Sequence, residues 1–135
     1  MRKLTWLLIA LVVACGDTRD AQHDAHGEDE NWAVTSWGKT YEIFAECAPL
    51  VVGKPVRSHT HVTVLSDFSP LRSGKVTAVL RADGRDSEFV QETALRDGIF
   101  SVEITPAAAG TYALIFRVES EAGKEDIASG TVRVA

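Results

Sequence analysis

Residues 49–80 read PLVVGKPVRSHTHVTVLSDFSPLRSGKVTAVL, and they set a pattern that the rest of the chain repeats. Two runs in this stretch, 57–65 and 75–81, alternate between apolar and polar side chains, as a β-strand with one buried face does. Loops rich in proline, glycine and serine bound both runs. Proline lacks the N–H that a strand ladder needs, and glycine adopts turn geometry. We therefore predict two short strands here.

The same alternation continues to the C-terminus. The Asp83-Gly84 pair predicts a tight hairpin turn, because both residues tolerate positive φ. Residues 110–118 form the most regular core strand, and Tyr112 near its start, after a loop from proline to glycine, resembles the tyrosine corner of immunoglobulin-like sandwiches. Alternation places these side chains on the inward faces of the expected strands: Val62, Val64, Val76, Ala78, Leu80, Phe100, Val102, Ile104, Tyr112, Leu114, Phe116 and Val118.

These strands predict the fold class. The chain has 135 residues, enough for one domain with an ordinary core. No apolar pattern with helical spacing competes with the strands in the region that we expect to fold. We predict an all-β domain at residues 37–135, an immunoglobulin-like two-sheet antiparallel sandwich of about seven strands.

The N-terminus has the pattern of an export signal. Arg2 and Lys3 precede an apolar run at 4–14, which is long enough for a signal peptide and too short to span a bilayer. The sequence Val12-Val13-Ala14-Cys15 resembles the lipobox of bacterial lipoproteins, which implies a signal peptide at 1–14 and lipid attachment at Cys15. An ordinary cleavage site that a cysteine follows by chance is the alternative.

Lipidation would fix the location of the protein. It implies a bacterial cell-envelope protein that is anchored in the membrane by its lipid and faces the periplasm. Because Gly16 rather than aspartate follows the cysteine, the resemblance favours the outer membrane over the inner one. Residues 15–36 would then be a flexible acidic tether, since most of that stretch has too few large apolar side chains to form a core.

Composition and motifs exclude several classes of function. The net charge is −5 and no basic stripe is present, so we expect no nucleic-acid partner. The sequence lacks the nucleophile, zinc-protease, redox and phosphate-loop motifs of common enzymes, so we expect no catalysis. If Cys15 carries lipid, Cys47 has no disulfide partner, and we expect it to be a buried small hydrophobe rather than a reactive or copper-binding thiol.

Two histidine pairs are candidates for metal binding. His59 and His61 lie two apart on an expected strand, so both rings project from the same face and could bind one ion. His23 and His26 lie in the acidic tether, where imidazoles and carboxylates could hold a cation weakly. The metal would be zinc or copper, and no cofactor is certain. The alternatives are outward polar residues on a strand and a solvated spacer.

Other residues support a family resemblance. They are Glu46, the run PLVVG at 49–53, His61-Val62-Thr63, Leu65, Asp67-Phe68, Pro70, Gly74, Val76, Leu80, Gly98-Ile99-Phe100, Thr105-Pro106, Gly110, Tyr112, Leu114 and Phe116. In this order they resemble the N-terminal β-sandwich of periplasmic adaptor subunits from heavy-metal tripartite efflux systems. The resemblance covers about residues 40–134. Those adaptors continue into a helical hairpin, which is absent here. The resemblance therefore implies a detached module that is an accessory to such a system.

The residues and the resemblance together predict a lipid-anchored binding module of the envelope. Its ligand would be a metal ion or an envelope component of metal efflux. The alternative is a structural or protein-interaction module that binds no metal and uses an exposed strand edge or apolar patch.

Overall fold

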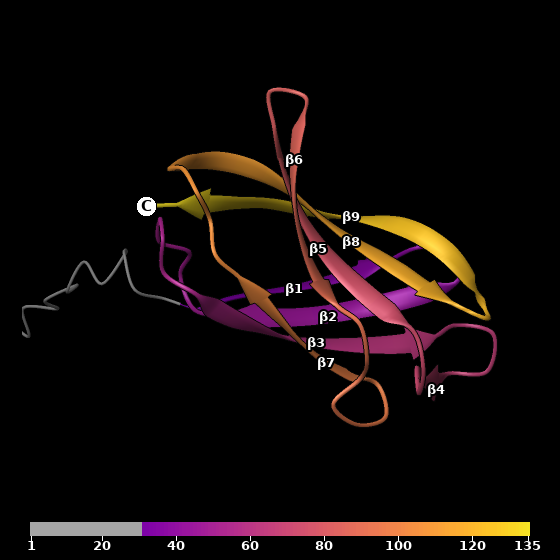
Figure 1. The fold of residues 1–135 in the computed structure, drawn as a ribbon. Helices are drawn as coiled ribbons and strands as arrows, with labels where there is room; N and C mark the ends of the chain where they lie inside the picture. Colours follow the sequence, from indigo (N-terminus) through magenta and orange to yellow (C-terminus); the bar gives the residue numbers. More distant parts are fainter. Residues whose placement is uncertain (1–30) are drawn as a thin grey trace, which may run out of the picture.

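The computed structural model describes residues 31–135. The expected signal peptide (1–14), Cys15, His23 and His26 lie outside the described residues. The described part is built from β-strands in two antiparallel sheets that pack face to face (Figure 1), which confirms the predicted all-β sandwich. In residues 31–135 there is no helix long and apolar enough to cross a membrane.

Sheet A contains five strands. Strand β3 is at its centre, with β2 and then β1 on one side, and with β7 and the short β4 on the other. The strands of sheet A are β1 (Trp32–Trp37), β2 (Tyr41–Cys47), β3 (Val56–Val64), β4 (Ser69–Pro70) and β7 (Ile99–Ile104).

Sheet B contains four strands in the order β6-β5-β8-β9. They are β5 (Lys75–Ala82), β6 (Arg85–Gln91), β8 (Gly110–Ser120) and β9 (Gly123–Val134). The β5–β6 hairpin turns at Asp83 and Gly84, whose φ angles of 51° and 69° confirm the predicted turn. Its tip projects beyond the rest of the sheet (Figure 1).

The sandwich begins earlier in the chain than the sequence predicts. The predicted tether extends to residue 36, but β1 runs from Trp32 and pairs along its whole length with β2. Trp32, Val34 and Ser36 lie opposite Cys47, Ala45 and Ile43, whose side chains are buried. The predicted boundary at residue 37 is therefore wrong, because residues 32–36 contribute an inward-facing row to sheet A.

The core lies between the two sheets. The alternation predicted for β5, β7 and β8 is confirmed, and Phe100 and Phe116 are fully buried. All buried members of the core cluster lie between Tyr41 and Val134, so the described part contains a complete hydrophobic core of its own. The largest fully buried side chains are Tyr41, Phe100, Phe116, Ile43, Leu50, Leu80, Ile104, Leu114 and Ile127.

The predicted tyrosine corner is also present. The Tyr112 hydroxyl donates a hydrogen bond of 2.9 Å to the carbonyl oxygen of Ala108, four residues upstream. This contact ties the loop before β8 to the strand, as in immunoglobulin-like sandwiches.

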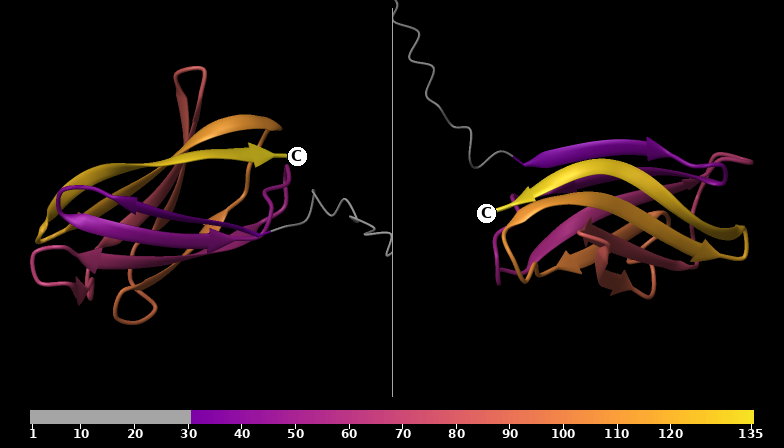
Figure 2. Two further views of the ribbon diagram at one scale, coloured as in Figure 1. Left: turned by 180° about the vertical axis from the view of Figure 1, so that it is seen from behind. Right: turned by 90° about the horizontal axis from the view of Figure 1, so that it is seen from above.

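The C-terminus and the start of β1 lie at the same end of the sandwich (Figure 2). At this end Leu50 forms a parallel bridge with Val134, and Val52 N–H donates to the carbonyl oxygen of Ala135. The β1–β2 and β8–β9 turns lie at the opposite end, so they are the part of the sandwich farthest from the point where the chain enters it.

Candidate functional site

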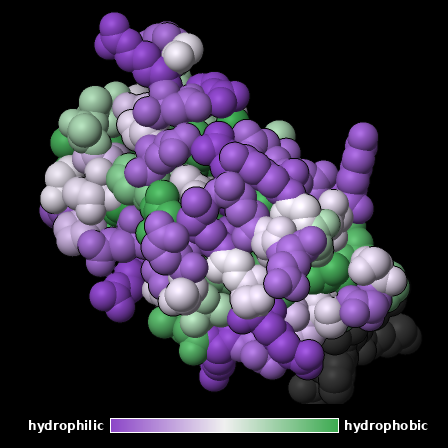
Figure 3. Space-filling model, turned by 45° about the vertical axis from the view of Figure 1, so that its right-hand side comes forward, coloured by the Kyte–Doolittle hydropathy of each residue, from purple (hydrophilic) through white to green (hydrophobic). Residues whose placement is uncertain are grey.

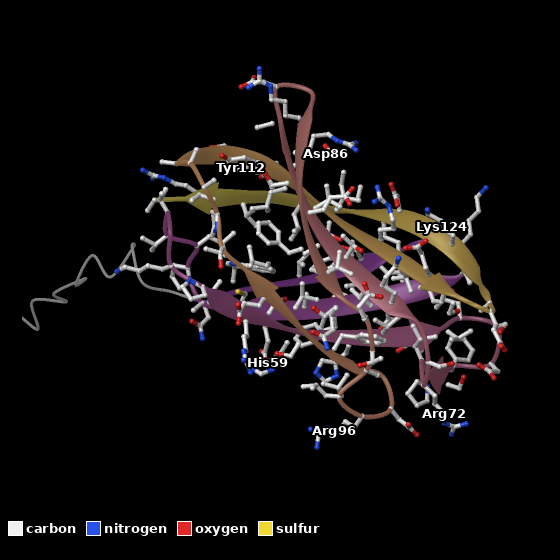
Figure 4. All side chains as sticks on the ribbon, in the orientation of Figure 1. His59, Arg72, Asp86, Arg96, Tyr112 and Lys124 are labelled. Atoms are coloured by element: carbon white, nitrogen blue, oxygen red, sulfur yellow. The ribbon has the colours of Figure 1, made fainter. Side chains whose placement is uncertain are left out.

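The two predicted ligands of β3 lie on the outer face of sheet A. Ser58, Thr60 and Val62 point into the sandwich and are buried, so period two turns His59 and His61 outward, and both are exposed. Figure 4 shows His59 on the side of sheet A that faces away from sheet B. The prediction that both imidazoles share one exposed face is therefore confirmed.

The strand register gives His61 aromatic and apolar neighbours, while His59 lies opposite Glu46 and Ser101. His61 lies opposite Phe44 on β2 and opposite Ile99 on β7. The rings of Phe44 and His61 meet edge to face, with their centroids 5.6 Å apart and an interplanar angle of 64°. Trp37, one strand farther, is 64% exposed, and its indole N–H donates to Glu42 at 2.8 Å. We name this surface the histidine face and define it by Trp37, Phe44, Glu46, His59, His61 and Ile99.

Among residues 31–135, the histidine face offers two imidazole ligands to a metal. Glu46 lies opposite His59 in the register. Nevertheless, no three His, Cys, Asp or Glu side chains come together among residues 31–135 in a way that could hold an ion. Zinc takes four ligands in tetrahedral geometry at structural sites. Within one described domain, the histidine pair is thus an incomplete site whose other positions water would fill.

The charges around the histidine face favour a cation. The strands of sheet A contain three acids, Glu42, Glu46 and Glu103, and one base, Arg57. Arg57 pairs with Glu103 at 3.6 Å, and both side chains are exposed. Excess negative charge raises the local concentration of cations, although salt screens the effect at an exposed surface.

The outer face of sheet B is different, because ion pairs cover it. Arg117 lies 2.8 Å from Glu88 and 2.7 Å from Asp126, and the hydrogen bonds that its guanidinium donates to Asp126 and Glu88 raise its pKa. Val79 and Ile115 lie on the same outer face, where they point outward by alternation and yet are buried, and Glu88 lies opposite Val79 in the register. Two further groups of ion pairs, Arg81–Asp86 and Lys75–Glu119–Lys124, complete the cover, and Figure 4 labels Asp86 and Lys124.

Figure 3 shows the distribution of hydrophilic and hydrophobic side chains on one side of the molecule. Hydrophilic side chains cover most of it, and the hydrophobic ones form separate patches. Singly exposed apolar side chains are normal on soluble domains. The exposed Trp37 and Phe44 stand out because they share one sheet face with the histidines.

A groove of about 520 Å³ lies between the β5–β6 hairpin and the loop before β8. Leu80 and Tyr112 line it, and its charged side chains are Asp83 and Arg85. The Tyr112 hydroxyl already donates to Ala108. This groove therefore brings together no acid–base pair or nucleophile with a partner, and its shape alone assigns no chemistry to it.

Cys47 is buried, as predicted, and it is a free cysteine. Burial raises the pKa of its thiol to about 11, so the thiol is protonated at neutral pH. A protonated thiol is neither a nucleophile nor a good metal ligand. Cys47 points into the core opposite Trp32, on the other side of sheet A from the histidine face.

Phe44 and Trp37 were not among the predicted site residues. Phe44 stands between Ile43 and Ala45, so period two could have placed it outward with the histidines. Trp37 gave no such signal, because its sequence neighbours did not predict a strand at residues 32–37. Comparison of the chain with protein-family models, curated proteins and solved structures found no match, and its function has to be inferred from its own residues.

Proposed function

We propose that this protein is a lipid-anchored binding module of the bacterial cell envelope that captures zinc or copper(II) through the histidine face and is not an enzyme. The observation that carries the proposal is the placement of His59 and His61 on one exposed face of β3. Neutral imidazole suits both metals. Residues two apart along a strand have Cα atoms about 7 Å apart, and both side chains project from the same face.

The binding is weak, because one chain supplies few ligands. Two imidazoles leave at least two positions of a tetrahedral ion to water. The excess of acidic residues on sheet A adds attraction without adding direct ligands. Acid weakens the site, since a protonated imidazole has no lone pair to give to a metal. His23 and His26 in the expected tether are a second place where the chain would hold the same ions.

Lipidation at Cys15 supports the envelope location, on the basis of the apolar run and the Val-Val-Ala-Cys sequence that ends it. Replacing Cys15 with Ala abolishes acyl labelling in cells and moves the protein out of the membrane fraction. Unchanged labelling and fractionation would refute the anchor.

The resemblance to adaptors of heavy-metal efflux suggests the context of this binding. A sandwich domain that holds metal ions near the outer membrane would act as an accessory to such a system. Its protein partner would be an envelope component of the efflux machinery. The residues that carry the resemblance include Glu46 and His61 of the histidine face, but it assigns a metal-binding role to neither, so it supports the context and not the ligand set.

Isothermal titration calorimetry tests the metal site. Residues 16–135, produced without lipid, are titrated with zinc and with copper(II) at neutral pH. The double variant H23A/H26A, which removes the same number of imidazoles outside the sandwich, is the matched control for H59A/H61A. We expect H59A/H61A to lose heat that H23A/H26A retains. Equal heat from H59A/H61A and the unaltered chain would contradict the proposal, as would no heat with either metal.

A protein-interaction module without metal is the second candidate. Two observations favour it: Trp37 and Phe44 are exposed, and β1 is an edge strand without a single charged residue. An uncharged edge is open to pairing with a strand of another protein. A photo-crosslinker at Thr35 that attaches to an efflux component in metal-depleted cells, and equally well in H59A/H61A, would favour this candidate.

A further inference from the structure

We propose that zinc joins two copies of this chain through their histidine faces, with His59 and His61 of both copies as its four ligands. This inference rests on the proposed function, because it takes the β3 pair as metal ligands. It goes further by naming what completes the coordination.

The first reason is the incomplete ligand set. His59 and His61 share a face, and the described residues bring no third ligand to them. A two-fold axis through the metal supplies two more imidazoles from the same residues of a second copy. The result is a site with four nitrogen ligands, the number that tetrahedral zinc takes.

The second reason is access. Strand β3 lies inside sheet A, and its neighbours β2 and β7 continue the same open face on either side. His59 and His61 are exposed on it. Two sheets pack face to face about 10 Å apart, and imidazoles that reach from both sides can meet one ion across that distance.

The third reason is the apolar surface beside His61. Phe44 and Ile99 flank His61 on the two neighbouring strands, and the exposed Trp37 lies on the next strand. In a symmetric pair, these side chains face the histidine face of the second copy. Burying them adds hydrophobic stabilisation that a lone metal ion on one chain does not obtain.

Charge makes the pairing dependent on metal. The charged residues on the strands of sheet A are Glu42 and Glu46 on β2, Arg57 on β3 and Glu103 on β7, while β1 and β4 have none. Two such faces carry the same sign of excess charge and repel each other without an ion between them. A divalent cation at the centre offsets that repulsion, so the chain is a monomer without metal and a dimer with zinc.

Sedimentation velocity tests the inference on residues 16–135, which contain the complete core. We expect the monomer mass in EDTA, twice that mass at one zinc per two chains, and reversal by EDTA. H59A/H61A stays monomeric with zinc, and H23A/H26A dimerises as the unaltered chain does. Cobalt(II) in place of zinc gives the intense visible absorption of a tetrahedral site in the unaltered chain and not in H59A/H61A. Circular dichroism checks that both variants are folded.

The other outcomes separate the two proposals. Zinc could bind at one ion per chain, through His59 and His61, without a change in the mass of the protein. That result would overturn the dimer and leave the proposed function standing. A dimer that persists in H59A/H61A, or disappears only in H23A/H26A, would also overturn it. If zinc produces neither heat nor a change in mass, the dimer is overturned, and if copper(II) also produces no heat, the proposed function fails as well.

Discussion

The Tyr41 hydroxyl of sheet A lies 2.6 Å from the carbonyl oxygen of Gly123 in sheet B, and it donates a hydrogen bond to that oxygen. The Ser120 hydroxyl lies 2.6 Å from the same phenol oxygen, and because a phenol has one proton to give, Ser120 is the donor there. Tyr41 is fully buried. One side chain thus ties β2 to the β8–β9 turn, at the end of the sandwich remote from the C-terminus.

Replacing Tyr41 with Phe should lower the free energy of unfolding by about 1–3 kcal/mol, because the change leaves the Gly123 carbonyl without its donor. Tyr112→Phe is the matched control. It removes one hydrogen bond at an exposed position and should cost about 0.5–1.5 kcal/mol. Urea unfolding measures both values. A Tyr41→Phe variant as stable as the unaltered chain would show that the bond contributes nothing between the sheets.

Glu125 on β9 makes a second link between the sheets. Its carboxylate accepts hydrogen bonds from the backbone N–H groups of Lys39 at 2.5 Å and Thr40 at 2.9 Å. Burial alone would raise the pKa of Glu125, but the hydrogen bonds from Lys39 and Thr40 outweigh it and lower the pKa below 4.5. A lowered carboxyl pKa stabilises the fold above the unfolded-state value, and the gain disappears as pH falls through the folded-state value.

Glu125→Gln should therefore destabilise the domain by about 1–2 kcal/mol at neutral pH, because a charged acceptor is lost. The difference from the unaltered chain should shrink as pH falls below 4.5. Gly38 offers a check, since a Cβ there would lie 2.5 Å from the Glu125 carboxyl carbon. Gly38→Ala should displace the carboxylate and so destabilise the domain. This loss of unfolding free energy should largely vanish when Gly38→Ala is made in a Glu125→Ala variant. Additive costs, or a difference that does not change with pH, would contradict this role.

Phe116 and Arg117 are neighbours on opposite faces of β8. Phe116 is fully buried in the core, and Phe116→Ala should cost about 3–5 kcal/mol. Arg117 makes its ion pairs on the outer face, where exposed pairs contribute little, and Arg117→Ala should cost about 1 kcal/mol. Urea melts compare the two, and similar losses would mean that the assignment of the two faces is wrong.

Cys47 should be unreactive in the folded domain. Burial raises the pKa of its thiol from 9.0 to about 11. As the pH rises, the folded chain therefore keeps the thiol proton to a higher pH than the unfolded chain does. The resulting stability is complete below pH 9 and is lost as pH rises through 11. Residues 16–135 should react slowly with a thiol reagent at neutral pH and fast in urea. Cys47→Ala should remove part of the stability loss between pH 9 and 11. Fast reaction of Cys47 with the thiol reagent in the absence of urea would refute the prediction.

Local patterns predicted the parts of the fold that depend on local chemistry. Alternation identified the buried faces of β5, β7 and β8, and turn chemistry identified the hairpin at Asp83-Gly84. The tyrosine corner at Tyr112 was also recognisable from one residue and the loop before it. Each of these features is set by residues that lie within one strand or turn.

The features that the sequence did not predict join distant parts of the chain. Glu125 bonds to backbone groups 85 and 86 residues away, and Leu50 pairs in parallel with Val134. Such pairings have no signature within a window of sequence. Residues 32–36 of β1 were assigned to the tether, because their pairing with β2 is likewise not visible within a short window of sequence.

The candidate site shows the same division. Spacing along β3 placed His59 and His61 on one exposed face, and that prediction is confirmed. Their neighbours Phe44 and Ile99 come from the register of three strands, which the sequence does not reveal. The sequence also does not reveal whether a further metal ligand lies near His59 and His61, because that depends on which strands adjoin β3.

Zinc titration of ¹⁵N-labelled residues 16–135, followed residue by residue by NMR, tests the metal-binding histidine face most directly. We expect the amide signals of His59 and His61 to shift or broaden first, together with those of Phe44 and Ile99 beside them. The signals of Arg117 and its neighbours on sheet B should stay in place. Changes confined to the segment around His23 and His26, or no changes at all, would contradict the assignment of metal binding to this face.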